Sequence, residues 1–337
     1  MARVRLEDVA KHAGVSMKTV SNVVHDFPHV SAKMRERVQT SIDLLGYRPN
    51  AMGRGLATGR TGLIALALAD VTIPYFAELA RMISTHSTKR GYRLLLEQTD
   101  SSIEEERAIV SASEAGLVDG VIFQPAAMSS LEIAKHRSDV PIVLLGEGPA
   151  PLGLDHVMID NVEAATTVTR HLASLGRRRI GFLGHEQGRP TETSKIRIMG
   201  YQRGLELEDL PVDPSLLVAS AAISAQAAAV ALGAALDGGL RIDGLVCRDD
   251  LAAIGALRAL AERGIDVPGE VAVTGWDDIA MASFTHPTLT TIAADTTALA
   301  DTALDLLEER ISGFEGLGRH LIVPHHLVIR ESAPESA

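Results

Sequence analysis

From Leu63 onward, short apolar runs typical of β-strands alternate with stretches that repeat apolar residues at helical spacing. This alternation constrains the fold most, because each strand–helix–strand unit builds a parallel sheet covered by helices on both faces, and about ten strands suit two sheets better than one. The clearest strand-like runs are residues 63–68, 93–96, 120–123, 142–145, 156–159, 180–183, 244–246 and 271–274. The helical stretches between them include residues 76–90, 104–115, 162–175, 196–205, 222–236 and 251–263.

The length of 337 residues predicts about two large domains, or two domains and a small module. The net charge is −11, but residues 1–60 carry a net charge of +5 and the remainder carries −16. The sequence therefore joins a basic N-terminal head to an acidic body. With 46% hydrophobic and 22% charged residues, the composition excludes a collagen-like or largely disordered chain.

Cysteine usage and hydropathy point to the cytoplasm. Cys247 is the single cysteine, so no intramolecular disulfide can form. The N-terminus has no apolar segment of the kind that a signal peptide carries, and the longest apolar run, residues 63–69, is too short to cross a membrane. We expect a cytoplasmic protein with no membrane partner.

The basic head predicts three short helices between residues 6 and 45. Gly14 suits the end of the first helix, while Ser16 and Ser31 suit the N-caps of the second and third. Two helices joined by a tight turn and braced by a third form a helix-turn-helix. The outer face of the second helix carries Met17, Lys18, Ser21, Asn22 and His25. These side chains can reach base edges or phosphates, and the basic charge favours DNA binding over a merely solvated face.

Four short motifs in and directly after the head allow a more specific comparison. They are Asp8-Val9-Ala10, Ala13-Gly14-Val15-Ser16, Thr19-Val20-Ser21 and Tyr47-Arg48-Pro49-Asn50. In this order they resemble the N-terminal signature of the LacI/GalR (lactose-repressor) family of bacterial transcription regulators. His25 replaces the usual Asn of that signature, and Met34 replaces the usual Thr. The resemblance implies a repressor that binds a pseudo-palindromic operator in double-stranded DNA, and a protein associated with the nucleoid when bound. It implies base reading by Met17, Lys18 and Asn22, and backbone contacts by Ser16, Thr19, Ser21, Ser31 and Asn50.

Residues 47–61 form a glycine-containing linker between the head, residues 1–46, and the body, residues 62–337. A flexible linker is one interpretation. The other is a helix of about two turns. Such a helix would be marginally stable alone, because helices shorter than ~12 residues are marginal in water and because Gly53 and Gly55 disfavour helix formation. The family resemblance favours a hinge helix that folds in the minor groove, where apolar wedges kink DNA. The minor-groove residues it implies are Arg54, Leu56 and Ala57.

Polar side chains gather at the predicted carboxyl ends of the body's strands, where open α/β sheets bind ligands. For any one of them, a helix cap or a loop charge is the more common explanation. The family resemblance implies a periplasmic-binding-protein-like effector domain with two Rossmann-like lobes. The N-lobe would span residues 62–161 and 293–322, and the C-lobe residues 162–292 and 323–332. The implied effector contacts are Arg197, Arg248, Asp249 and Asp277, with Tyr75, Phe76, Gln124 and Glu147 as weaker candidates.

Two departures from the family pattern bear on the effector. Arg248 stands where members usually have Asn or Ser, and Ala221-Ala222 stands where many members have an aromatic wall. Arg197 and Arg248 together could favour an anionic effector, such as a sugar phosphate or sugar acid. Alternatively, Arg248 pairs with Glu147 or Asp277. We expect a small-molecule effector that is a carbohydrate or a sugar phosphate.

The competing functions are an α/β enzyme and a transport solute-binding protein. The sequence has no G-x-G-x-x-G, P-loop or G-x-S-x-G motif, so we expect neither catalysis nor a cofactor. His325 and His326 are poor joint metal ligands because neighbours on a strand point to opposite faces, and no metal is expected. The basic head argues against a transport protein. Dimerisation is expected from the family resemblance alone.

Overall fold

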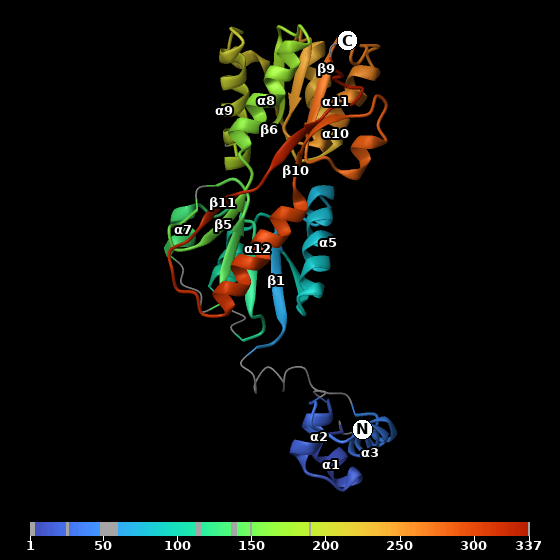
Figure 1. Cartoon of the computed structure of the whole chain (residues 1–337). Coiled ribbons are helices and arrows are strands. Elements are labelled where there is room, and N and C mark those ends of the chain that lie inside the picture. Colours follow the sequence, from blue (N-terminus) through green and yellow to red (C-terminus); the bar gives the residue numbers. More distant parts are fainter. Residues whose placement is uncertain are drawn as a thin grey trace. The chain divides into compact units, whose positions relative to one another are not determined.

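The computed structural model of the chain describes residues 4–24, 27–47, 60–111, 116–135, 140–148, 150–188 and 190–335. Its contacts divide the chain into two compact units: Met1–Gly62, which contains the head, and Leu63–Ala337, which makes up the body (Figure 1).

The head consists of α1 (Leu6–Ala13), α2 (Met17–Val24) and α3 (Ala32–Leu45). The predicted helix-turn-helix is confirmed. Gly14 ends α1 with a φ of 62°, a value that a residue without a side chain adopts at little cost. The three helices bury a small shared core that includes Val9, Val20 and Val38.

The first sheet of the body has six strands in the order β11-β5-β4-β3-β1-β2, and every pairing in it is parallel. We call this sheet and its helices the N-lobe. Its strands are β1 (Leu63–Leu68), β2 (Arg93–Gln98), β3 (Gly120–Phe123), β4 (Ile142–Leu145), β5 (Asp155–Met158) and β11 (His320–Ile322). Its helices are α5 (Pro74–Lys89), α6 (Ile103–Val110), α7 (Ser130–Lys135) and α12 (Thr296–Ile311).

The second sheet also has six strands, in the order β12-β10-β9-β8-β6-β7, and only the edge strand β12 runs antiparallel among its described pairings. We call this half the C-lobe. Its strands are β6 (Ile180–Glu186), β7 (Leu217–Ser220), β8 (Gly244–Cys247), β9 (Ala272–Trp276), β10 (Thr290–Ala294) and β12 (His325–Val328). Its helices are α8 (Asn161–Ser174), α9 (Glu192–Leu207), α10 (Ala225–Asp237) and α11 (Asp250–Ala261), with short 3₁₀ turns at Pro214–Leu216 and Ala280–Ser283.

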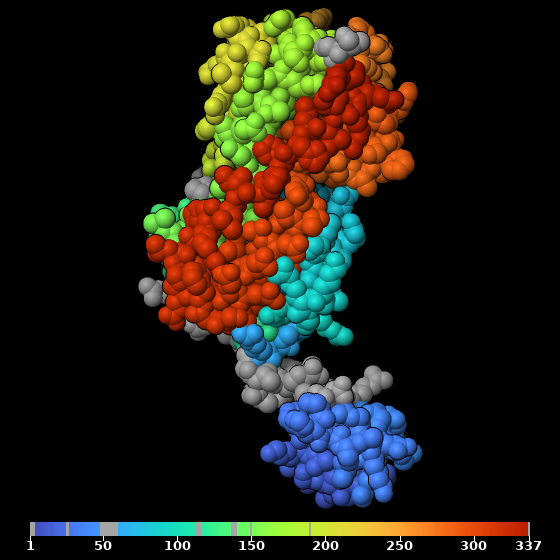
Figure 2. Space-filling model, in the orientation of Figure 1, coloured from blue at the N-terminus to red at the C-terminus, as the bar shows by residue number. Residues whose placement is uncertain are grey.

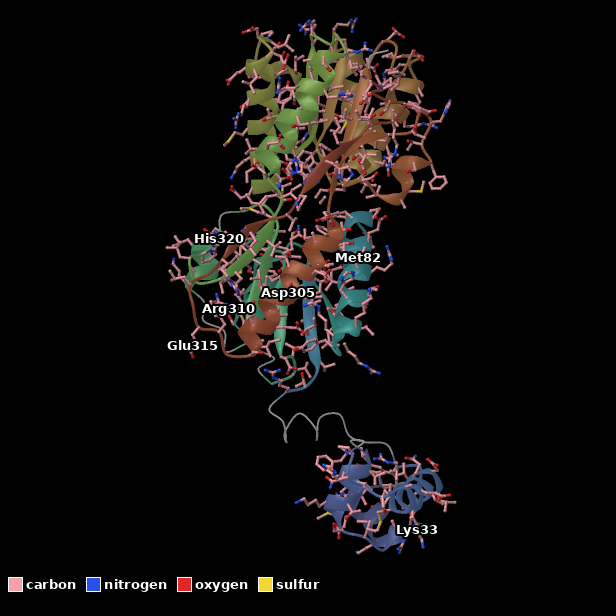
Figure 3. The ribbon with its side chains drawn as sticks, viewed as in Figure 1. Lys33, Met82, Asp305, Arg310, Glu315 and His320 are labelled. Atoms are coloured by element: carbon pink, nitrogen blue, oxygen red, sulfur yellow. The ribbon has the colours of Figure 1, made fainter. Side chains whose placement is uncertain are left out.

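Helices cover both faces of each sheet, as the alternation in the sequence predicts. In the N-lobe, α5 and α12 pack on the face that buries Ile64 and Leu66, and α6 and α7 cover the face that buries Ala65 and Ala67. In the C-lobe, α8 and α9 cover one face, while α10 and α11 cover the other. Figure 3 shows Asp305 and Arg310 on α12 and Met82 on α5.

The chain crosses between the lobes three times: from β5 to α8, from β10 to α12 and from β11 to β12. The crossings lie side by side, since Asp295 N donates to Pro324 O at 2.9 Å and Val323 N donates to Met158 O at 2.8 Å. In Figure 2 the C-terminal part of the chain, in red, runs over both lobes. The carboxyl ends of the strands before the crossings therefore lie where the two lobes meet.

Candidate functional site

The outer face of α2 in the head presents the side chains predicted to read bases. Val20 and Val23 are buried against the other helices, which leaves Met17 and Lys18 exposed and Asn22 half-buried. Met17 is 55% exposed although it is apolar. An apolar contact and a cation at the start of a recognition helix suit a thymine methyl group and a guanine edge.

Two serines predicted to contact the DNA backbone also cap helices. Ser16 Oγ accepts a hydrogen bond from Thr19 N at 3.1 Å and lies 2.9 Å from Thr19 Oγ1. Ser31 Oγ accepts from Met34 N at 3.4 Å. These bonds orient hydroxyl groups at the N-termini of α2 and α3, where backbone N–H groups favour phosphate. Ser21 is half-buried on α2. Asn50, Arg54, Leu56 and Ala57 lie outside the described residues.

In the body, Arg197 is the centre of a polar network between the lobes. It lies on α9 and is only 6% exposed. Its Nε donates to Asn161 Oδ1 at 3.0 Å, its Nη1 donates to Arg248 O, and its Nη2 donates to Glu147 Oε1 at 3.3 Å. The guanidinium group also stacks 4.0 Å from the ring centre of Trp276. Arg197 therefore contacts the N-lobe through Glu147, a crossing between the lobes through Asn161, and strand β9 of the C-lobe through Trp276.

Arg248 is salt-bridged, but not to the residues that the sequence suggested. Its Nη1 lies 3.2 Å from Glu186 Oε1, and its Nη2 bonds Asp249. The suggested partner Glu147 is bound by Arg197 instead. Asp249 is fixed from its other side, because it caps α11 by accepting from Ala252 N at 2.8 Å.

The N-lobe contributes aromatic and acidic groups to the same region. Tyr75 and Phe76 begin α5 with their rings 5.4 Å apart. Burial, and then the nearby carboxylates of Asp277 and Glu147, raise the pKa of the Tyr75 hydroxyl. Tyr75 of the N-lobe therefore lies near enough to Asp277 of the C-lobe for their charges to interact.

Asp277 follows β9 and has a φ of 107°, which is unusual for a residue with a side chain. Burial raises the pKa of its carboxyl group well above the usual range, against the opposing charge of Arg197 and with support from Asp250, Asp249 and Glu147. Strained backbone and a displaced pKa are common at functional sites.

Six of the eight predicted effector contacts thus share one network of bonds and charges: Arg197, Arg248, Asp249, Asp277, Tyr75 and Glu147. Phe76 joins it through its ring contact with Tyr75. Gln124 follows β3 and lies next to Gly146, where an added Cβ would be 3.4 Å from Gln124 Cγ. Its Oε1 is buried without a hydrogen-bond partner among the described residues.

The prediction missed several members of this network. Asn161, Trp276 and Glu186 bond or stack with the two arginines, and Thr193 Oγ1 donates to Glu147 Oε2 at 2.8 Å. Thr193 lies four residues before Arg197, so helical periodicity could have placed it on the same face. Asn161 is one of the polar residues that follow a predicted strand, so strand-end polarity does mark it, whereas Trp276 lies inside β9 and local sequence gives no signal that it contacts Arg197.

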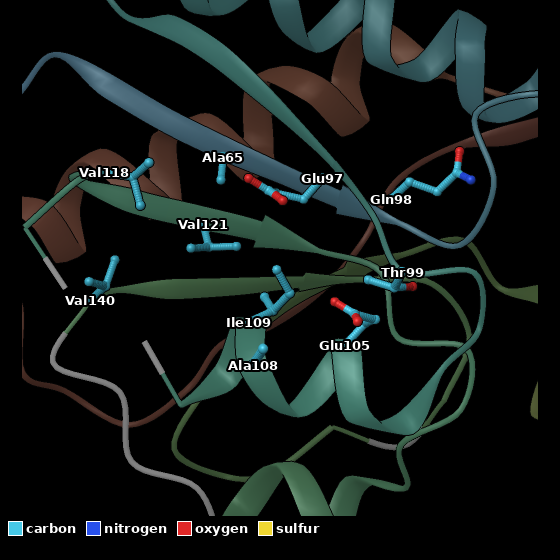
Figure 4. A pocket seen from close by; sticks show the side chains of 10 residues that line it. All are labelled: Ala65, Glu97, Gln98, Thr99, Glu105, Ala108, Ile109, Val118, Val121 and Val140. Atoms are coloured by element: carbon cyan, nitrogen blue, oxygen red, sulfur yellow. The ribbon is translucent and has the colours of Figure 1, made fainter. Parts of the chain in front are cut away.

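Two cavities lie away from this network. One, of about 260 Å³, is between the first sheet and α6 (Figure 4), and its lining is Ala65, Glu97, Gln98, Thr99, Glu105, Ala108, Ile109, Val118, Val121 and Val140. The other, of about 330 Å³, lies between the end of β7 and α10 and is walled mainly by alanines, Ala221 among them. None of the eight predicted effector contacts lines either cavity.

Across the described ranges, no helix is long and apolar enough to cross a membrane. The same residues contain no group of three or more His, Cys, Asp or Glu side chains that could hold a metal ion.

A helix-turn-helix head followed by two doubly wound lobes with a polar network between them defines a DNA-binding protein with a ligand-sensing body. Residues 5–50 match the model for bacterial regulatory proteins of the lacI family, and residues 169–333 match the periplasmic binding protein-like domain. The chain is 30% identical to the HTH-type transcriptional regulator RegA of Clostridium saccharobutylicum, with 97% of this chain and 98% of that protein aligned. The chain belongs to the LacI family, and it is a transcriptional regulator rather than an enzyme.

Solved structures agree with this assignment. The lac repressor dimer bound to operator and the anti-inducer ONPF superposes with a TM-score of 0.87 at 26% identity, covering 99% of this chain and all of that one. The complex of the transcriptional regulator CelR with cellobiose superposes with a TM-score of 0.72 at 29% identity, covering 98% of this chain and all of that one.

Proposed function

We propose that this regulator is a dimeric repressor whose operator affinity is controlled by a neutral, hydroxyl-rich effector, such as a sugar, bound between the lobes. The main observation in favour of a neutral effector is that both arginines are already paired with carboxylates. Arg197 is paired with Glu147, and Arg248 is paired with Glu186 and Asp249. An anionic effector would have to displace these carboxylates, which argues against the sugar phosphate or sugar acid that the sequence left open.

The charge balance supports the same choice. Two guanidinium groups are paired with three carboxylates, those of Glu147, Glu186 and Asp249, and the carboxyl group of Asp277, whose pKa is raised, lies near them. Hydroxyl groups can donate to the carboxylates and accept from the guanidinium groups, so a polyol suits both. Seven buried polar atoms lack a hydrogen-bond partner among the described residues, and three of them belong to residues at the carboxyl ends of β3, β6 and β8, where a ligand could satisfy them: Gln124 Oε1, His185 Nε2 and Arg248 Nε.

Thermal shift of the full chain tests the effector class. The ligands are D-ribose, D-galactose, D-glucose and cellobiose, with D-glucose 6-phosphate and D-gluconate as the anionic set. Binding to the folded state adds about 2.7 kcal/mol at a ligand concentration 100 times Kd, so a true effector raises Tm. We expect a neutral sugar to raise Tm and Arg197→Ala to abolish the shift. A larger shift with the anionic set at equal concentration would reject a neutral effector.

Operator binding is tested on the DNA upstream of the regulator's own coding sequence, by fluorescence anisotropy. Lys18→Ala is expected to weaken specific binding by about 1–3 kcal/mol, the usual contribution of a base contact. The control is Lys89→Ala, which removes the same charge from α5 of the body. Equal losses in both variants would reject base reading by Lys18.

The hinge proposal has its own test. Leu56→Ser replaces the proposed minor-groove wedge by a polar side chain, so we expect weaker operator binding with an unchanged Tm shift from the effector. Wild-type operator affinity in Leu56→Ser would rule out the wedge.

A further inference from the structure

Among the described residues, two carboxylates of the N-lobe accept hydrogen bonds from the C-lobe. One is Glu147, which bonds Thr193 and Arg197 within the polar network described above. The other is Glu78, which lies outside that network. Its Oε1 accepts a hydrogen bond from Ala280 N at 3.0 Å. Glu78 lies in the first part of α5, close to Tyr75, and Ala280 begins the 3₁₀ turn that follows β9.

The segment held by Glu78 is the one that carries Asp277. Asp277 and the next residue, Asp278, both have positive φ values, 107° and 51°. Such backbone persists only where its surroundings fix it. Here, the next two amides are each taken by a carboxylate: Ile279 N donates to Asp250 Oδ2 at 2.8 Å, and Ala280 N donates to Glu78. One carboxylate belongs to the C-lobe core and the other to the N-lobe.

The helix at the other end of this contact is itself firmly joined to the N-lobe. His86 Nδ1 lies 2.7 Å from Asp301 Oδ1 of α12, and Arg90 bonds Asp301, Asp305 and Glu308 along the same helix. Since α12 packs across β3, β4 and β5, a displacement of α5 is transmitted to the body of the N-lobe.

We propose that Glu78 is a positioning residue that ties the Asp277 segment of the C-lobe to α5 of the N-lobe, so that this contact limits how far the two lobes can move apart. Two residues, Asp278 and Ile279, separate Asp277 from Ala280. A ligand that bonds Asp277 therefore acts on the relative position of the lobes through Glu78 without touching it. The role of this contact in regulation rests on the proposed function, which assigns Asp277 to effector binding. The contact between Glu78 and Ala280 does not depend on that assignment.

The backbone at residue 279 allows a selective test. Ile279 has φ −61° and ψ 152°, the extended conformation that a residue before proline adopts. Ala280 opens a 3₁₀ turn, a position that tolerates proline. Ala280→Pro therefore removes the donor with little change of conformation, while Glu78→Ala removes the acceptor. Glu78→Gln retains an acceptor oxygen and serves as the conservative variant.

The first readout is the distance between the lobes, measured by double electron–electron resonance on the full chain without DNA or ligand. Spin labels are placed at Leu131→Cys on α7 and Met199→Cys on α9, whose side chains are 65% and 57% exposed. Cys247 is buried, and burial raises the pKa of its thiol, so it does not react with the label. The second readout is hydrogen exchange of the amides of residues 281–284.

We expect Glu78→Ala and Ala280→Pro each to broaden the distance distribution about twofold and to speed amide exchange at least tenfold. The double variant is expected to show the same broadening and the same exchange rates as either single variant, because both remove the same hydrogen bond. Glu78→Gln is expected to restore most of the wild-type behaviour. The matched control is Glu104→Ala on α6, whose carboxylate bonds Ser102 within its own lobe. A merely structural role would lower Tm without separating the four variants in this way.

Distances and exchange that match the Glu104→Ala control in both single variants would overturn the proposal. So would a double variant whose effects are the sum of the two. Neither readout involves DNA or sugar, so such results leave the proposed function intact. Conversely, a regulator that binds no neutral sugar rejects the effector class and leaves the role of Glu78 standing.

Discussion

Neighbouring carboxylates near the cleft differ in their chemistry because their partners differ. Asp249 is paired with Arg248 and caps a helix. Asp250, the next residue, is fully buried and bonds no cation among the described residues. It accepts from Thr291 Oγ1 at 2.6 Å and from Ile279 N at 2.8 Å. Burial raises the pKa of Asp250 to about 7. Sequence alone could not separate these two adjacent aspartates.

Asp250 makes the stability of the body depend on pH. The carboxyl group has a pKa of about 3.9 in an unfolded chain. It has a pKa of about 7 in the folded one. The folded state therefore binds the proton more tightly. The stabilisation by protonated Asp250 is complete below pH 4 and is lost as the pH rises through 7. Asp250→Asn supplies the same acceptor and a permanent donor, so we expect its stability relative to wild type to increase between pH 5 and pH 8.

The measurement is urea unfolding at pH 5, 6, 7 and 8, followed by the fluorescence of Trp276, the single tryptophan, which is buried in the body. Asp295→Asn is the control, because Asp295 is an exposed helix cap on α12. Parallel pH profiles for wild type and Asp250→Asn would show that Asp250 is already ionised at pH 5.

Helix pairs in the C-lobe depend on glycine for their close approach. An added Cβ at Gly200 of α9 would lie 2.4 Å from Val162 O and 2.7 Å from Ala165 Cβ of α8. Gly255 of α11 has the same relation to α10, with Ala225 O at 2.2 Å. In terms of helix propensity alone, a glycine inside a helix lowers stability by about 1 kcal/mol relative to alanine. The structure gives the reason it is there, since backbone atoms of the neighbouring helix occupy the space.

Gly200→Ala is therefore expected to destabilise the body, although alanine favours a helix. Over-packing of this kind costs about 1–3 kcal/mol, and backbone cannot move aside as a flexible side chain can. Gly153→Ala is the matched control, because no atom lies within 4 Å of the added Cβ there. Urea unfolding of both variants measures the difference. Gly200→Ala with stability equal to or above Gly153→Ala would mean that α8 and α9 are further apart than described.

At the level of elements, sequence patterns predicted the continuously apolar strands, but they did not single out edge strands such as β11 or the helix α12. The runs at 63–68 and 142–145 coincide with β1 and β4 because buried parallel strands are continuously apolar. By contrast, β11 has three exposed residues at a sheet edge, and only tertiary pairing with β5 defines it. Likewise, the position of Glu147 after a predicted strand marked it as a site residue. The hydrogen bond between Glu78 and Ala280 could not be predicted in this way, because it depends on how the two lobes meet.

For the whole molecule, the separation of charge determines how DNA binding responds to salt. The net charge of −11 would disfavour a polyanion, yet residues 1–60 carry +5 and the rest carries −16. Cations that neutralise phosphates release condensed counterions, and the logarithm of the binding constant falls by about 0.9 for each phosphate contact per logarithmic unit of salt. The salt dependence should therefore come from the head alone.

Lys33 provides the test, because it is exposed in the first turn of α3, two residues after the N-cap Ser31 (Figure 3). If each head of a dimer uses Lys33 on a phosphate, Lys33→Gln removes two contacts and lowers the salt slope by about 1.8. Lys89→Gln in the body should leave the slope unchanged. Operator anisotropy between 50 and 300 mM KCl measures both. A change of only about 0.9 would mean that one head is engaged, and an equal change in Lys89→Gln would mean that the body also touches DNA.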